Sequence, residues 1–173
     1  MPEAIRIIQR RRQSALAISA SVGTFKLGKV MGPAYESIQS HLKKNNIIPG
    51  NSDIPFTVYR NIDWEHVGDQ GFMPMIRTMF IKKWDLEIGI PCPESTPVDG
   101  EIQRLVLEEG NYASTIHSGP YRTVGETYTK IQKYVRDQKL GALKNYSIEF
   151  YLNDPRKVSQ EDLRTEVLVP IIS

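Results

Sequence analysis

Two similar stretches set the architecture: A-L-A-I-S-A-S-V-G-T-F at residues 15–25 and Y-A-S-T-I-H-S-G-P-Y at residues 112–121. Each has the composition of a β-strand and stops at a glycine turn. A helical pattern follows each stretch, from residue 33 to about 45 and from about 123 to 138. The chain therefore contains the same strand, turn and helix unit twice.

Further strands surround these units and give each half the order β-β-α-β-β. They are residues 5–8, 56–61 and 85–91 in the first half, and residues 102–107, 149–153 and 165–170 in the second. The first strand of each half is expected to form a hairpin with the strand that follows it. The first half also carries an extra segment, residues 62–78, between its last two strands.

We predict an α+β fold, a tandem pseudo-twofold repeat of β-β-α-β-β units. These units form one continuous antiparallel sheet, with two helices on one face and a ligand groove on the other. Repeat 1 spans residues 4–91, the proline-containing linker residues 92–100, and repeat 2 residues 101–173. The whole chain, residues 1–173, is predicted to be a single domain. No DNA-binding domain is expected, because the residues before Ala15 have a strand pattern.

Composition argues against several classes of function. The 22 Lys+Arg and 20 Asp+Glu residues give a net charge of +2, which argues against direct nucleic-acid binding. No apolar run reaches the roughly 18 to 20 residues that span a bilayer, and no signal-peptide core is present. We therefore expect a cytoplasmic protein with no membrane partner. The lone Cys92, the unpaired histidines and the absence of nucleotide-binding motifs predict neither a metal nor a cofactor.

Strand alternation assigns the side chains to the two faces of the sheet. The apolar set Ile148, Phe150 and Leu152 is expected to meet the helix, which leaves Glu149 and Tyr151 on the opposite, open face. The same reasoning adds three residues to the open face: Tyr59, Glu87 and Glu166.

A carboxylate among aromatic side chains is costly to desolvate and tends to have a raised pKa. Such a group either holds a cation against aromatic ring faces or transfers protons near neutral pH. The alternative is that these glutamates simply face water. Thr57 is the repeat counterpart of Glu149, so this carboxylate breaks the symmetry. Glu149→Gln is expected to change stability little, since a residue on an open face makes few core contacts.

Other aromatic and histidine residues have less distinctive settings. Trp64 lies in the extra segment among glycines and methionines, which suits either a lid over a ligand or a connection packed on the sheet. Trp84, Tyr35 and Tyr128 are in phase with apolar neighbours and are predicted to be core. His117 precedes a glycine turn and is predicted to make a local hydrogen bond rather than act as a base.

Three stretches together have a familiar order and spacing: H-S-G-P-Y at residues 117–121, E-F-Y-L-N-D-P at 149–155 and T-E-V-L-V-P-I at 165–171. With them the chain resembles the GyrI-like small-molecule-binding family. That family includes effector-binding domains of bacterial-type MerR and AraC multidrug regulators and stand-alone relatives. The resemblance implies the tandem SOUL/GyrI-like fold. It also implies a groove glutamate that contacts lipophilic cations among aromatic side chains, which by motif is Glu149.

The resemblance leaves three functions open. The first is a stand-alone binding protein for lipophilic, aromatic or cationic small molecules. The second is a hydrolase that opens cyclopropane-bearing genotoxic natural products with Glu149 as general base. The third is a gyrase-inhibitor-type module that binds a protein partner, and the oligomeric state stays open. The predicted ligand-binding residues are Glu149, Tyr151, Tyr59, Trp64, Glu166, Glu87 and Tyr121.

Overall fold

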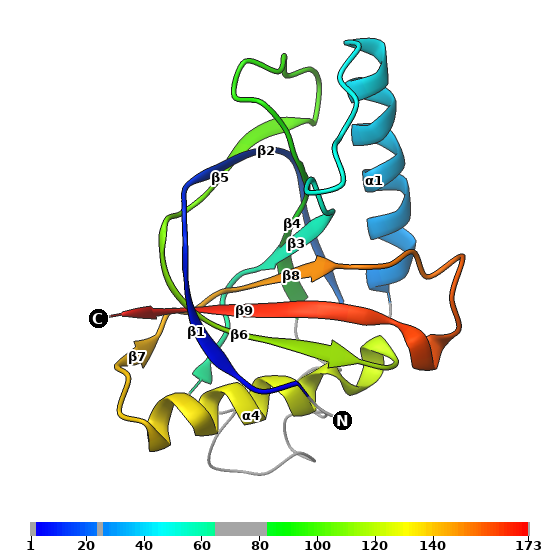
Figure 1. The fold of residues 1–173 in the computed structure, drawn as a ribbon. Helices are drawn as coiled ribbons and strands as arrows, with labels where there is room; N and C mark the ends of the chain where they lie inside the picture. Colours follow the sequence, from blue (N-terminus) through cyan, green and yellow to red (C-terminus); the bar gives the residue numbers. More distant parts are fainter. Residues whose placement is uncertain (1–2, 24–25, 65–82, 173) are drawn as a thin grey trace.

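The computed structural model describes residues 3–23, 26–64 and 83–172. The first half contains β1 (Arg6–Arg10), β2 (Gln13–Gly23), α1 (Leu27–Lys44), β3 (Phe56–Tyr59) and β4 (Lys83–Pro91). The second half contains β5 (Gln103–Leu107), β6 (Gly110–Ser118), η2 (Tyr121–Thr123), α4 (Val124–Asp137), β7 (Ala142–Leu143), β8 (Ser147–Tyr151), η3 (Gln160–Asp162) and β9 (Arg164–Ile172). All strand pairs are antiparallel, and Figure 1 shows the curled sheet with its two long helices. The predicted α+β class is confirmed.

The strand order in the sheet is β1-β6-β9-β8-β3-β4-β2-β5, with β7 paired to β9 outside this path. The two halves therefore meet at the centre of the sheet, where β3 pairs with β8. Helix α1 packs against β2 and β4, and helix α4 packs against β6 and β9. The central strands β3 and β8 consequently lie between the two helices (Figure 1).

The predicted hairpins were wrong, because the first strand of each half pairs with the other half. β1 pairs with β6, and β5 pairs with β2. A two-residue hairpin loop needs residues such as glycine or asparagine that accept positive φ. The links at residues 11–12 and 108–109 are Arg-Arg and Glu-Glu instead, so the chain runs on rather than reversing. Arg10 pairs with Gly110 and Gln13 with Leu107, which places the two links opposite each other.

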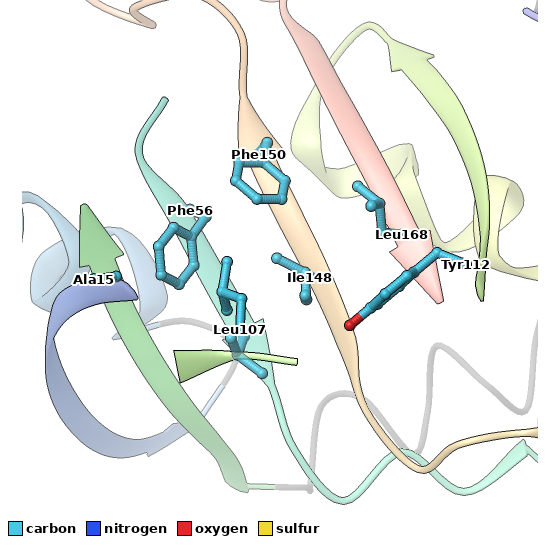
Figure 2. Packing of buried hydrophobic residues seen from close by; sticks show 8 residues of the cluster. Ala15, Phe56, Leu107, Tyr112, Ile148, Phe150 and Leu168 are labelled. Atoms are coloured by element: carbon cyan, nitrogen blue, oxygen red, sulfur yellow. The ribbon is translucent and has the colours of Figure 1, made fainter. Parts of the chain in front are cut away.

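The predicted face assignment was also wrong: the helices lie on the Glu149 face of the sheet. Glu149 is paired with Val167 across β8 and β9, and Val167 packs in one cluster with Ile131 and Val135 of α4. The opposite set, which includes Ile148 and Phe150, packs against other strands on the inside of the curl (Figure 2). Because a curled sheet buries both faces, alternation alone could not tell which apolar face meets the helices.

Helix α1 begins at Leu27 rather than at the predicted Pro33. The added turns contain glycines, which are weak helix formers and obscure the pattern. Leu27, Val30 and Met31 nevertheless pack against the cluster of Leu86 and Ile88 on β4, so tertiary contacts stabilise helix where propensity does not.

Of the predicted extra segment, residues 62–78, the structure describes only residues 62–64. The hypothesis that this segment forms a lid therefore lies mostly outside the described residues. In the described ranges, no helix is long and apolar enough to cross a membrane.

Candidate functional site

Glu149 lies on the central strand β8, on the side of the sheet that carries both helices. Glu149 is only 4% exposed. Its Oε1 accepts a hydrogen bond from the hydroxyl of Tyr128 on α4 at 2.7 Å, and its Oε2 accepts one from Tyr151 on β8 at 3.2 Å. In the part of the chain that the structure describes, no basic side chain forms an ion pair with this carboxylate. Among the described residues, the buried negative charge is thus held only by neutral hydroxyl donors.

Burial raises the pKa of Glu149 to about 7. The hydrogen bonds from Tyr128, Tyr151 and Tyr59 oppose this rise, since they favour the ionised form. Burial also raises the pKa values of these three tyrosines well above their usual range, so their hydroxyls stay protonated and able to donate. The carboxyl group therefore exchanges its proton near neutral pH within a set of fixed donors.

Four tyrosines surround the centre of the site in symmetric pairs. Tyr35 of α1 donates to the Phe56 carbonyl at 2.7 Å and lies 3.0 Å from the Thr57 hydroxyl. This arrangement repeats that of Tyr128 and Glu149 in the other half. The hydroxyls of Tyr59 and Tyr151, from paired positions of the two repeats, are 3.2 Å apart. The site therefore lies on the pseudo-twofold axis, and Glu149 is the charged member of an otherwise matched set.

Further aromatic rings extend the site outward. Tyr121 packs edge-on against Tyr151, with ring centroids 5.7 Å apart, and is 39% exposed. The Trp64 ring lies 6.0 Å from that of Tyr128, and its Nε1 donates to the Lys144 carbonyl. Trp84 packs edge-on against Tyr59 at 6.0 Å. Each tryptophan therefore lies next to a tyrosine of the site.

The predicted site set is split between the two faces of the sheet. Glu149, Tyr151, Tyr59, Tyr121 and Trp64 are brought together on the helix face by the contacts given above. Glu87 is paired with Val58 and Glu166 with Phe150, which puts both carboxylates on the other face. There Glu87 forms an ion pair with Arg60, and Glu166 accepts a hydrogen bond from Ser114 at 2.9 Å.

Comparison with known proteins identifies the kind of domain that carries this site. None of the curated proteins matches the chain. The family model of the GyrI-like small molecule binding domain matches residues 5–172, nearly the whole chain. The chain belongs to the GyrI-like small-molecule-binding family. The resemblance drawn from the sequence is confirmed.

Solved structures share the GyrI-like fold at low sequence identity. The EcmrR C-terminal domain has a TM-score of 0.75 at 18% identity and covers 99% of this chain and 98% of its own. A hydrolase encoded by lin2189 from Listeria innocua has a TM-score of 0.68 at 13% identity, with 97% and 91% covered. SAV2435 bound to tetraphenylphosphonium has a TM-score of 0.60 at 10% identity, with 98% and 94% covered.

The GyrI-like chain spans 58% of the length of EcmrR in its complex with DNA, at a TM-score of 0.73, 18% identity and 98% of this chain covered. At such identities these likenesses show the shared fold alone.

The sequence predicted Tyr35 and Tyr128 to be core residues. It did not predict that their hydroxyls contact Thr57 and Glu149 at the centre of the site. The signal was present, because the two tyrosines occupy matching places in the helices of the two repeats. The local hydrogen bonding predicted for His117 is confirmed: its Nδ1 lies 2.9 Å from the Thr127 hydroxyl and its Nε2 3.2 Å from the Pro120 carbonyl. Within the described residues, no group of three or more acidic, histidine or cysteine side chains could hold a metal ion.

Proposed function

We propose that this GyrI-like chain binds lipophilic aromatic cations and that Glu149 supplies the opposite charge. The observation that carries the proposal is the buried carboxylate, which has only tyrosine hydroxyls as partners in the described structure. A buried charge without a counter-ion is costly, and protonation relieves that cost. A bound cation would relieve it as well, so charge and burial together favour a positively charged ligand.

The surrounding rings suit the apolar part of such a ligand. Three tyrosines contact Tyr151: the rings of Tyr35 and Tyr121 pack edge-on against it, and the Tyr59 hydroxyl lies 3.2 Å from its hydroxyl. A cation over an aromatic face gains about 0.5–2 kcal/mol, with more at desolvated sites. The structure of SAV2435 with tetraphenylphosphonium shows this class of ligand bound to a protein of the same fold, which supports the proposal.

Two ions of nearly equal size and opposite charge test the proposal directly. Tetraphenylphosphonium should quench the fluorescence of Trp64 and Trp84 saturably, because both rings lie beside tyrosines of the site. Tetraphenylborate, the anionic control, should not bind. Glu149→Gln should weaken tetraphenylphosphonium binding at pH 8 by at least about tenfold, the loss expected for one charged partner. Equal binding of both ions, or unchanged affinity in Glu149→Gln, would reject the proposal.

A second candidate function is hydrolysis of strained rings on aromatic natural products. A carboxyl group with a pKa of about 7, hydrogen-bonded by two tyrosines, has the properties of a general base near neutral pH. In that reaction Glu149 would take a proton from water as the water oxygen attacks a cyclopropane carbon and the ring C–C bond breaks. The other carbon, which keeps the electron pair of the broken bond, would then take that proton from Glu149.

Mass spectrometry distinguishes catalysis from simple binding. Wild-type protein incubated with a cyclopropane-bearing aromatic compound should yield a product heavier by one water, and Glu149→Gln should yield none. Recovery of the intact compound with saturable fluorescence quenching would leave a binding protein only.

A further inference from the structure

A row of polar side chains in the second repeat continues the site beyond Glu149. Tyr151 on β8 is paired with Thr165 on β9, and Thr165 is paired in turn with His117 on β6. Paired residues of neighbouring antiparallel strands lie on the same face of a sheet. The three side chains therefore share the helix face with Glu149 and form its next row.

The matching row of the first repeat is apolar past its tyrosine. There Tyr59 on β3 is paired with Leu86 on β4, and Leu86 with Ala20 on β2. Thr165 thus takes the place of Leu86, and His117 the place of Ala20. The second repeat departs from its partner toward polarity on the same side as Glu149, so the charged and polar substitutions are clustered rather than scattered.

Thr165 is the member of this row whose hydroxyl forms no hydrogen bond with the described residues. The residue is fully buried. Both ring nitrogens of His117 are already close to polar atoms, of Thr127 and of Pro120. A buried hydroxyl without a partner is destabilising, and an apolar side chain as at Leu86 would avoid this cost. The presence of the Thr165 hydroxyl beside the site therefore points to a use in ligand binding.

We propose that the Thr165 hydroxyl is a second polar anchor of the ligand site, taking a hydrogen-bonding group of the bound molecule. This inference rests on the proposed function and narrows its ligand class to aromatic cations that also carry a hydroxyl or carbonyl group. A threonine hydroxyl both donates and accepts, so either group is suitable. Glu149 and Thr165 occupy diagonal positions on neighbouring strands, with Cα atoms about 7–8 Å apart.

That spacing corresponds to about the length of one substituted phenyl ring between the cationic centre and the hydrogen-bonding group. Because Thr165 is buried, the ligand must displace a neighbouring side chain to reach it. Tyr121 packs against the adjacent Tyr151 and is the exposed aromatic residue of this part of the site.

Matched probes test the anchor by a change in preference. The probes are tetraphenylphosphonium derivatives with one ring bearing a hydroxymethyl group or an ethyl group of the same size, at the ortho, meta or para position. In wild-type protein, at least one hydroxymethyl isomer should bind better relative to its ethyl counterpart than it does in Thr165→Val. The expected change is about 3- to 10-fold, the net effect of one hydrogen bond.

Thr115→Val is the control variant. Thr115 is also a buried threonine of the helix face, but its hydroxyl donates to the Glu3 carbonyl at 2.9 Å. This variant should leave the hydroxymethyl preference unchanged. Unchanged preference in Thr165→Val for all three isomers, with tetraphenylphosphonium still bound, would overturn the anchor alone. Failure of tetraphenylphosphonium to bind wild-type protein would reject the cation site and the anchor with it.

A measurement without ligand tests the unpaired state of the hydroxyl. Thr165→Val should leave the melting temperature of the free protein unchanged or raise it, because no hydrogen bond is lost. Thr115→Val should lower it, since its bond to Glu3 is removed. A fall in Thr165→Val as large as that in Thr115→Val would show that the hydroxyl is already engaged within the protein, and would overturn the proposal.

Discussion

Glu149 makes the free protein less stable as it ionises. The expectation that Glu149→Gln would change stability little assumed an open face, whereas the side chain is buried between the helices. Its pKa rises from an ordinary 4.5 to about 7 on folding. The folded state therefore binds the proton more tightly than the unfolded state does, and folding becomes less favourable as the proton is lost.

The unfolding free energy of the wild-type protein should fall as pH rises from about 4.5 to about 7 and then level off. Glu149→Gln removes this dependence and should be more stable than wild type at pH 8 by up to about 3 kcal/mol, with little difference at pH 4.5. Urea denaturation of both proteins at the two pH values measures the effect. Equal stability of the two proteins at pH 8 would contradict the buried charge.

The tyrosine on each helix gives a matched pair of variants. Tyr128→Phe removes a hydrogen bond that lowers the pKa of Glu149, so the carboxyl group should ionise at a higher pH. The pH midpoint of tetraphenylphosphonium binding should then shift upward, by roughly one unit for a hydrogen bond to a charged group. Tyr35→Phe, which removes the equivalent contact to Thr57, should leave the midpoint in place. Calorimetric titrations from pH 5.5 to 8.5 would show both, and equal shifts in the two variants would exclude a specific role for Tyr128.

At the scale of elements, the close pairing of β3 and β4 depends on a missing side chain. Gly89 lies opposite Phe56, and a Cβ at Gly89 would be 2.5 Å from Phe56 Cζ and 3.0 Å from the Leu16 carbonyl oxygen. The Phe56 ring is fully buried and packs against Phe150 with ring centroids 5.5 Å apart. Neither strand can move without disturbing the core inside the curl.

Gly89→Ala should therefore lower the unfolding free energy by about 1–3 kcal/mol, the cost of overpacking a filled core. Gly28→Ala in α1 is the control, because a Cβ there meets nothing within 4 Å. It should stabilise the protein by about 0.5–1 kcal/mol, since alanine is the better helix former. Thermal or urea unfolding of both variants measures the difference, and a neutral Gly89→Ala would show that the Phe56 ring has room to move.

At the scale of the whole molecule, three strand pairs join the two halves of the chain: β1 with β6, β2 with β5 and β3 with β8. Each half therefore completes the sheet of the other. We propose that residues 1–173 form a single domain for this reason, although the sequence divides into two repeats.

A cut in the linker should leave the two halves associated. Val98 is 53% exposed, so a protease site introduced at this position is accessible to cleavage. The cleaved protein should elute as one particle in gel filtration, separate into two chains in denaturant, and keep its affinity for tetraphenylphosphonium. Separation of the halves under native conditions would contradict the strand exchange.

The sequence was informative where the signal is local. The repeat, both helices and the position of Glu149 on its strand follow from periodicity, and they agree with the structure. Two features are non-local and were missed. The exchange of β1 and β5 depends on strands that are distant in sequence, because β1 pairs with β6 and β5 pairs with β2. The face on which Glu149 lies depends on the curl of the sheet, which buries Phe150 and Val167 equally on opposite sides.

The pairing of Thr57 with Glu149 at the centre of the sheet has an evolutionary consequence. In a homodimer of one repeat, both positions would hold the same residue. Two glutamates there would place like charges on directly opposed side chains, with Cβ atoms about 4.5–5.5 Å apart, and they would repel each other. Once a gene is duplicated and fused, the two copies can diverge, and one keeps a carboxylate while the other keeps a neutral hydroxyl. A monovalent cation can thus be matched by a single charge beside the axis, which two identical glutamates could provide only by sharing one proton.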